Sequence, residues 1–411
     1  MTQVHFRTFF GHSCGRPRPF ALRCCGRPRA AVVRPSYAAC NVHHATRRSQ
    51  AFAVPVHRRF VHSNPRRNRS LAMPFHRTLA AAVLGAALCS PLAWAADPLP
   101  ALGADPAQTS VSGLSSGAFM AVQYQVAYSG SVVGAGVVAG GPYYCAAGSL
   151  YNTGICMGQV PFVPPNPALM VSAAKRFASN GQIDPLDGMQ RGRIYVFSGT
   201  KDTIVYQQAV DATVSFFKQA GVPGGNISYV NTVPAGHALI TPSFGNDCPA
   251  NAAPYISHCT VSNQSYDQPG ALLSFIYGSL NPPASQLGGK IITFNQREFA
   301  AASTGMADDA YAYVPQSCAQ GTACRVHVAF HGCKQSANVV GDDFYEKTSY
   351  NSWADANNIV VLYPQVNASS VPYNPQGCWD WFGYTGQNYA MKSGSQMVAV
   401  NAMINRLTSK R

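Results

Sequence analysis

The first 95 residues of this 411-residue chain contain no aspartate or glutamate, although they contain 15 arginines. The formal charge of +14 for the whole chain is therefore confined to this segment. Residues 96–411 have 15 lysines and arginines against 16 acidic residues, a net charge of −1. A nearly neutral chain has no electrostatic footprint for nucleic acid, so nucleic-acid binding is excluded as its main function.

Potential metal ligands are also scarce after residue 95. Only four histidines follow it, at positions 237, 258, 327 and 331, and no C-x-x-C pair occurs. Structural zinc sites usually use closely spaced cysteines and histidines. The sequence therefore predicts no metal site.

The basic segment has no apolar run long enough for a comfortable membrane span. Residues 73–95 instead combine a short basic start (Met73–Arg77), an apolar run (Leu79–Leu88) and a small-x-small pattern at Ala93–Ala95. This combination predicts a secretory signal peptide and a secreted protein, extracellular or periplasmic, without a membrane span. Residues 1–72 are interpreted as an extension from a start codon assigned too early, with a disordered basic arm or a transit-type extension as the alternative.

Eight cysteines follow residue 95, and an even number in a secreted chain indicates disulfides. Local pairing is the economical interpretation, although the sequence alone leaves the connectivity open. It joins Cys145 to Cys156, Cys248 to Cys259, and Cys318 to Cys324, and leaves Cys333 with Cys378.

Short β-branched runs alternate with helix-compatible runs between residues 109 and 407, which predicts an α/β fold with a mostly parallel sheet and helices on both faces. Strands are expected at 109–112, 131–139, 193–198, 226–232, 290–294, 310–314, 325–330 and 359–363, and helices at 118–127, 168–179, 205–220, 270–280, 345–357 and 395–407. We expect residues 96–108 to be poorly ordered, residues 241–269 to form a disulfide-pinned excursion, and residues 96–411 to form one catalytic domain.

The motif Gly113-Leu114-Ser115-Ser116-Gly117 lies between a predicted strand and a predicted helix. A nucleophile elbow needs this context, because the sharp turn lifts the serine to the top of the sheet. Glycine and serine are common in ordinary turns, so the motif alone is a weak signal. The rest of the chain has to supply a base, an acid and an oxyanion hole.

His237 and Asp202 are the predicted base and acid. Both follow predicted strands, and the order Ser115, Asp202, His237 is that of α/β hydrolases. The alternatives are a helix N-cap for Asp202 and a solvated loop side chain for His237. The other histidines are less well placed, because His258 lies in a disulfide loop and His327 lies within a strand.

The backbone N–H of Ser116 is one predicted oxyanion donor, and that of Cys333, after the strand 325–330, is the other. In a standard α/β hydrolase the oxyanion strand precedes the elbow, whereas here it follows His237. Placing residues 290–411 before residues 109–280 restores the usual order. The sequence therefore predicts a circularly permuted sheet in which the last helix leads into the strand that carries Ser115.

These stretches resemble the polyhydroxybutyrate depolymerases, and most closely their single-domain, circularly permuted type. The resemblance rests on VSGLSSGAFMAVQ, YVFSGTKDTIV, VPAGHAL, VAFHGCKQS and NPQGCWDWFGY, among others, and covers most of residues 109–390. It implies an α/β-hydrolase fold and a Ser115–His237–Asp202 triad. It also implies oxyanion donors at Ser116 and Cys333, and it supports a Cys333–Cys378 bridge.

The resemblance further implies hydrolysis of poly(3-hydroxybutyrate) or its oligomers, without metal or cofactor. Trp379, Trp381 and Tyr143 are candidate substrate contacts, with core packing as the alternative for each. Two other functions stay open: an esterase or hydrolase acting on feruloyl or acetyl esters or polyaspartate, and a non-catalytic polymer-binding protein. The sequence leaves the oligomeric state undetermined.

Overall fold

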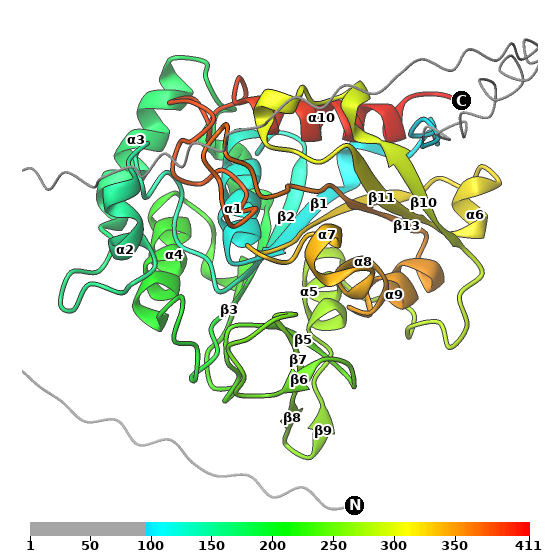
Figure 1. Cartoon of the computed structure of the whole chain (residues 1–411), viewed down its shortest axis with the longest axis horizontal. Helices are drawn as coiled ribbons and strands as arrows, with labels where there is room; N and C mark the ends of the chain where they lie inside the picture. The colour runs from blue at the N-terminus through cyan, green and yellow to red at the C-terminus, as the bar shows by residue number, and fades with distance from the viewer. Residues whose placement is uncertain (1–95) are drawn as a thin grey trace, which may run out of the picture. The chain divides into compact units, whose positions relative to one another are not determined.

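The structure is a computed structural model that describes residues 96–411. The predicted extension (1–72) and signal peptide (73–95) lie outside the described residues. An eight-stranded sheet forms the centre of the fold, with the strand order β10-β11-β13-β12-β1-β2-β3-β4 (Figure 1). Within residues 96–411, no helix is long and apolar enough to span a bilayer.

The five strands from β12 to β4 in the sheet order, together with β13, are parallel. At one edge, β11 pairs antiparallel with β13, and β10 pairs antiparallel with β11. This is the mostly parallel α/β-hydrolase sheet that the sequence predicts. In sheet order the strands are β10 (Lys290–Asn295), β11 (Asp309–Val314), β13 (Ile359–Tyr363), β12 (Arg325–Phe330), β1 (Thr109–Leu114), β2 (Val132–Val138), β3 (Arg193–Phe197) and β4 (Ile227–Val230).

The two halves of the chain meet at β1, which pairs with β12 on one side and β2 on the other. The end of α10 (Ser395–Thr408) lies beside the segment that enters β1, because the N–H groups of Leu102 and Ala104 both donate to the carbonyl of Leu407. This arrangement is the predicted circular permutation. It also corrects one expectation, since the lead-in at 96–108 is packed, with Leu99 only 1% exposed.

Helices cover both faces of the sheet. In Figure 1, α1 (Ser116–Ala127), α3 (Pro167–Ser179), α4 (Gln207–Gln219) and α10 lie on one side, and α5 (Gln268–Tyr277) and α9 (Tyr350–Ala356) lie on the other. Every residue of α1 is buried, and small residues such as Ala118 and Ala121 allow it to lie close to the sheet. The helix that carries the elbow is therefore held rigidly from all sides.

Two regions differ from the sequence-based expectation. The helix expected at 345–357 is two helices, α8 (Asp343–Glu346) and α9, because Ser349 takes a left-handed conformation (φ 63°) between them. The excursion at 241–269 contributes strands to two small sheets. These strands are only two or three residues long, which is too short for an alternating pattern to show in the sequence. The remaining short elements are α2 (Thr153–Cys156), α6 (Gln316–Ala319), α7 (Ala337–Val340), β5 (Leu239–Thr241), β6 (Asn246–Asp247), β7 (Ile256–His258), β8 (Thr260–Val261) and β9 (Gln264–Ser265).

All eight cysteines of the described region form disulfides. The pairs are Cys145–Cys156, Cys248–Cys259, Cys318–Cys324 and Cys333–Cys378, which are the pairs that local pairing favours. Three of them close loops of 6 to 11 residues, whereas Cys333–Cys378 joins positions 45 residues apart. This last bridge connects the loop after β12 to the aromatic loop that follows Cys378.

Candidate active site

Ser115 lies at a sharp turn between β1 and α1, with φ 56° and ψ −122°. Such a conformation costs a residue other than glycine roughly 1–3 kcal/mol, so the surrounding structure must enforce it. The two glycines of the motif explain how. A Cβ on Gly113 would overlap the carbonyl of Gly117, and a Cβ on Gly117 would overlap the carbonyls of Phe330 and His331. The elbow therefore packs directly against its own helix and the end of β12.

His237 and Asp202 are joined by a buried hydrogen bond of 2.8 Å between Nδ1 and Oδ2. The second carboxylate oxygen of Asp202 accepts from the N–H groups of Ile204 and Val205, at 2.8 and 2.9 Å. The carboxylate thus fixes its own loop and orients the imidazole at the same time. The N-cap alternative for Asp202 is wrong, because Tyr206 is the N-cap residue of α4. Because Asp202 accepts at Nδ1, the proton of a neutral His237 lies on Nδ1 and Nε2 is the basic nitrogen.

The loops that carry these two residues are held together by Asn251. Its side-chain oxygen accepts from the N–H groups of His237 (2.9 Å) and Thr203 (3.1 Å), and its amide nitrogen donates to the carbonyl of Lys201. The loops also approach closely, because a Cβ on Gly199 would overlap the carbonyl of Ala235. The separation between acid and base is therefore set by several contacts besides their own hydrogen bond.

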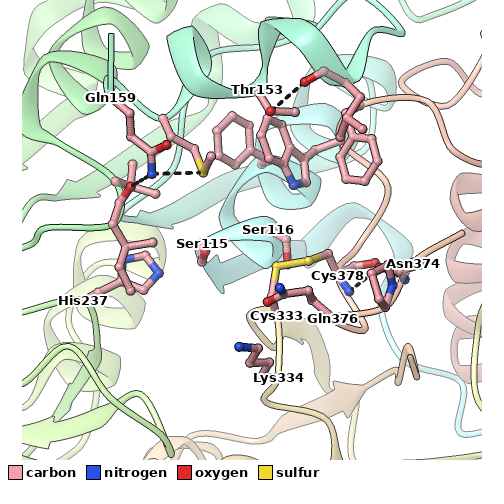
Figure 2. Close-up of a pocket in the computed structure, with 18 of the residues that line it drawn as sticks. Ser115, Ser116, Thr153, Gln159, His237, Cys333, Lys334, Asn374, Gln376 and Cys378 are labelled. Carbon is pink, nitrogen blue, oxygen red and sulfur yellow. Dashed lines mark hydrogen bonds between the residues drawn. A yellow bond between two sulfur atoms is a disulfide. The ribbon is translucent and has the colours of Figure 1, made fainter. Parts of the chain in front are cut away.

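Ser115 and His237 lie on the wall of one cavity of about 470 Å³ (Figure 2). Within the described residues, Nε2 of His237 has no hydrogen-bond partner, and neither does the hydroxyl of Ser115. Catalytic hydrogen bonds are often long without substrate and shorten only when the substrate binds. The structure therefore brings the three predicted triad residues to one site, with Asp202 behind His237 and away from the cavity.

The two predicted oxyanion donors border the same cavity, since Ser116 and Cys333 both line it (Figure 2). In the described part of the chain, neither backbone N–H donates to a protein acceptor. A Cβ on Gly332 would lie 3.5 Å from the Cβ of Ser115, so the loop after β12 reaches contact distance from the nucleophile. Two unpaired N–H groups beside a serine are what a developing oxyanion requires.

Of the three predicted substrate contacts, only Trp381 lines the cavity, where it stacks on Phe119 with ring centroids 4.3 Å apart. Trp379 and Tyr143 are both 0% exposed. Trp379 packs against Phe330, and the hydroxyl of Tyr143 donates to the carbonyl of Ala390. These two residues are core residues in this structure, which is the packing alternative for each.

Several cavity residues have no signal in the sequence, because most of them lie in irregular loops. Tyr255 lies edge-on to His237, with the ring centroids 6.0 Å apart. Lys334 is the only lysine or arginine among the residues that line the cavity. The other residues that line the cavity are Phe119, Leu150, Thr153, Met157, Gln159, Ile204, Val205, Tyr373, Asn374, Pro375, Gln376, Cys378 and Phe382. The wall is thus mainly apolar, with amides and hydroxyls at a few points.

The other three histidines lie away from the cavity wall. His258 is a surface residue, with a side chain 45% exposed. His327 and His331 are both completely buried, and burial lowers their pKa values to about 3 and about 4. In residues 96–411, no group of three histidine, cysteine, aspartate or glutamate side chains is arranged to hold a metal ion.

Comparison with known proteins identifies relatives of this site and fold. No family model matches the chain. A poly(3-hydroxybutyrate) depolymerase of Delftia acidovorans is 47% identical over 317 residues, which are 76% of this chain and 62% of the relative. A polyhydroxybutyrate depolymerase of Talaromyces funiculosus is 39% identical over 333 residues, 77% of this chain and 94% of the relative. The chain thus spans less than two thirds of the bacterial relative and almost all of the fungal one.

Solved structures agree with these relatives. The PHB depolymerase of Penicillium funiculosum, and a PHB depolymerase variant in complex with an R3HB trimer, each match with a TM-score of 0.68 and 37% identity. Each match covers 76% of this chain and 98% of the solved chain. At this identity and coverage, the chain belongs to the polyhydroxybutyrate depolymerase family, a family of ester hydrolases.

Proposed function

We propose that this chain is a secreted serine hydrolase that cleaves the ester bonds of poly(3-hydroxybutyrate) or its oligomers. One observation carries the proposal: Ser115 shares a cavity with His237, whose Nδ1 is hydrogen-bonded to Asp202. The names of the relatives, one of them in complex with an R3HB trimer, support the substrate class. The four disulfides support secretion, because such bonds persist in oxidising compartments.

In the first half of the reaction, the Oγ of Ser115 attacks the ester carbonyl carbon. The hydroxyl proton passes to Nε2 of His237, and the carboxylate of Asp202 stabilises the imidazolium through Nδ1. The carbonyl oxygen becomes an oxyanion and accepts from the N–H groups of Ser116 and Cys333. Collapse of this intermediate breaks the ester bond, and His237 returns its proton to the departing alcohol end of the polymer.

The second half of the reaction releases the acyl part. Ser115 now carries a hydroxyacyl group, and a water molecule takes the place of the departed alcohol. His237 removes a proton from the water, which attacks the acyl carbon through a second oxyanion intermediate. The proton then returns to the Oγ of Ser115, and the product leaves with a free carboxyl group. Apart from the substrate and this water molecule, each step uses only groups that this chain supplies.

A Ser115→Ala variant tests the proposal. We expect it to lose clearing of a turbid poly(3-hydroxybutyrate) suspension and labelling by a fluorophosphonate, while keeping the unfolding midpoint of the unsubstituted chain. Ser172→Ala is a matched control, because Ser172 lies on the exposed side of α3. Clearing by the Ser115→Ala variant would remove Ser115 from the mechanism. Faster turnover of feruloyl esters or polyaspartate than of hydroxybutyrate oligomers would reject the substrate class.

A further inference from the structure

The peptide between Gly332 and Cys333 carries the second proposed oxyanion donor, and its carbonyl end is also bound. The carbonyl oxygen of Gly332 lies 2.7 Å from Nδ1 of His331. In a trans peptide the C=O and N–H bonds point in opposite directions, so a fixed carbonyl direction also fixes the N–H direction. A hydrogen bond to the carbonyl further polarises the N–H of the same peptide.

We propose that His331 is a positioning residue that aims and polarises the Cys333 N–H by donating from Nδ1 to the Gly332 carbonyl. This inference rests on the proposed function, because it gives Cys333 the role of oxyanion donor. His331 does not touch the cavity, so it acts through this peptide and not on the substrate.

Both neighbours of the His331 ring require the same tautomer. The Gly332 carbonyl can only accept, so the proton must lie on Nδ1. The backbone N–H of Val366 can only donate, and it donates to Nε2 at 3.0 Å, so Nε2 must be unprotonated. The ring is 0% exposed and packs between Phe344 and Trp379. Its orientation is thus determined by hydrogen bonds at both nitrogens and by aromatic contacts.

The N–H groups of the two residues that flank Cys333 are also held in place. The N–H of Gly332 donates to Oε1 of Gln335 at 2.7 Å, and that of Lys334 donates to the carbonyl of Gln376 at 2.7 Å. The amide nitrogen of Gln335 in turn donates to the carbonyls of Pro254 and Tyr255, beside His237. The N–H groups on either side of Cys333 are therefore occupied by the protein.

Two amide substitutions separate the two hydrogen bonds of His331. The side-chain amide of asparagine reaches the position of Nδ1, so His331→Asn can still donate to the Gly332 carbonyl. The amide of glutamine reaches the position of Nε2, so His331→Gln can still accept from Val366 but not donate to Gly332. A purely structural role would make both variants lose activity in proportion to their loss of stability.

We expect His331→Gln to lower kcat on a soluble p-nitrophenyl ester by about 10- to 100-fold with little change in KM, since removal of a whole donor costs about 100- to 1,000-fold. Inhibition by a trifluoromethyl ketone, which forms an oxyanion adduct with a serine, should weaken by a similar factor. His331→Asn should lose much less of its kcat and of its affinity for the trifluoromethyl ketone. His258→Gln is the control for loss of a histidine, because His258 lies on the surface. Equal losses of kcat in the Asn and Gln variants would overturn the inference.

A second measurement needs no variant. NMR of the imidazole nitrogens in the unsubstituted chain should find His331 neutral, with its proton on Nδ1, and a proton on Nε2 would overturn the inference even if the variants fail to fold. Failure of the proposed function is distinguishable from failure of this inference. If Ser115→Ala retains activity, the proposed function fails. If Ser115→Ala is inactive while the Asn and Gln variants behave alike, only the role of His331 fails.

Discussion

His327 should make the protein lose stability in mild acid, because it joins the two central strands in its neutral form. His327 belongs to β12 and its ring contacts β1, with Nδ1 2.6 Å from the hydroxyl of Ser110 and Nε2 2.8 Å from that of Ser112. Tyr350 bonds to Ser112, and Tyr277 bonds to Ser110 and to backbone carbonyls.

These contacts form a chain of hydrogen bonds that all run in the same donor-to-acceptor direction. Tyr277 must donate to a carbonyl, so Ser110 donates to Tyr277 and accepts from Nδ1 of His327. Nε2 is then unprotonated and accepts from Ser112, which accepts from Tyr350. A second proton on His327 would turn the Ser112 and Tyr350 hydroxyls around and place a charge in a fully buried site.

The size of the effect follows from the two pKa values. Burial lowers the pKa of His327 from the ordinary value of 6.5 to about 3, so below pH 6.5 the unfolded chain binds a proton that the folded chain does not. Stability is therefore fully present above pH 6.5 and falls as the pH falls towards the folded pKa. At pH 5 the loss from one such histidine is about 2 kcal/mol, and His331, with a pKa of about 4, adds a loss of similar size.

Urea unfolding followed by tryptophan fluorescence at about pH 7.5 and about pH 5 measures this loss. The variant His327→Gln cannot take up the proton, so we expect its loss between the two pH values to be smaller by about 2 kcal/mol than that of the unsubstituted chain. His258→Gln should keep the full loss, because the side chain of His258 is 45% exposed. The reasoning is refuted if His327→Gln loses as much stability on acidification as the unsubstituted chain.

Five further substitutions separate chemistry from packing. Asp202→Asn should lower kcat on a soluble ester by about 10,000-fold, because an amide no longer holds the Nδ1–H tautomer of His237, and a loss below about tenfold would remove Asp202 from the triad. Gly117→Ala should lower the free energy of unfolding, measured by urea unfolding, by about 3 kcal/mol, because its Cβ meets two carbonyls. Gly224→Ala, with open space around its Cβ, should change the free energy of unfolding little, and equal losses in the two variants would contradict this account. Trp381→Ala should raise KM for soluble hydroxybutyrate oligomers, whereas Trp379→Ala should act mainly on stability, by about 3–5 kcal/mol, and the reverse result would exchange their roles.

The features that the sequence predicts correctly depend on short stretches of chain. Buried parallel strands appear as apolar runs, so β12 and β13 match their predicted ranges residue for residue. The G-x-S-x-G elbow is readable because the turn needs glycines at fixed positions around Ser115. Even the permutation can be inferred, because the order of the motifs along the chain departs from the usual one.

Side-chain roles depend instead on which distant residues meet, and only the tertiary structure decides them. Neighbouring positions such as Trp379 and Trp381 have similar chemistry, yet one is buried against Phe330 and the other lines the cavity. His327 acquires its partner Ser112 across 215 residues of sequence. The sequence by itself determined the order of elements, the elbow and the pairing candidates, because these follow from local backbone geometry. Burial and long-range contacts determine the tautomers of the buried histidines, the hydrogen bonds around His327 and the orientation of the Cys333 peptide. No local sequence pattern encodes these contacts.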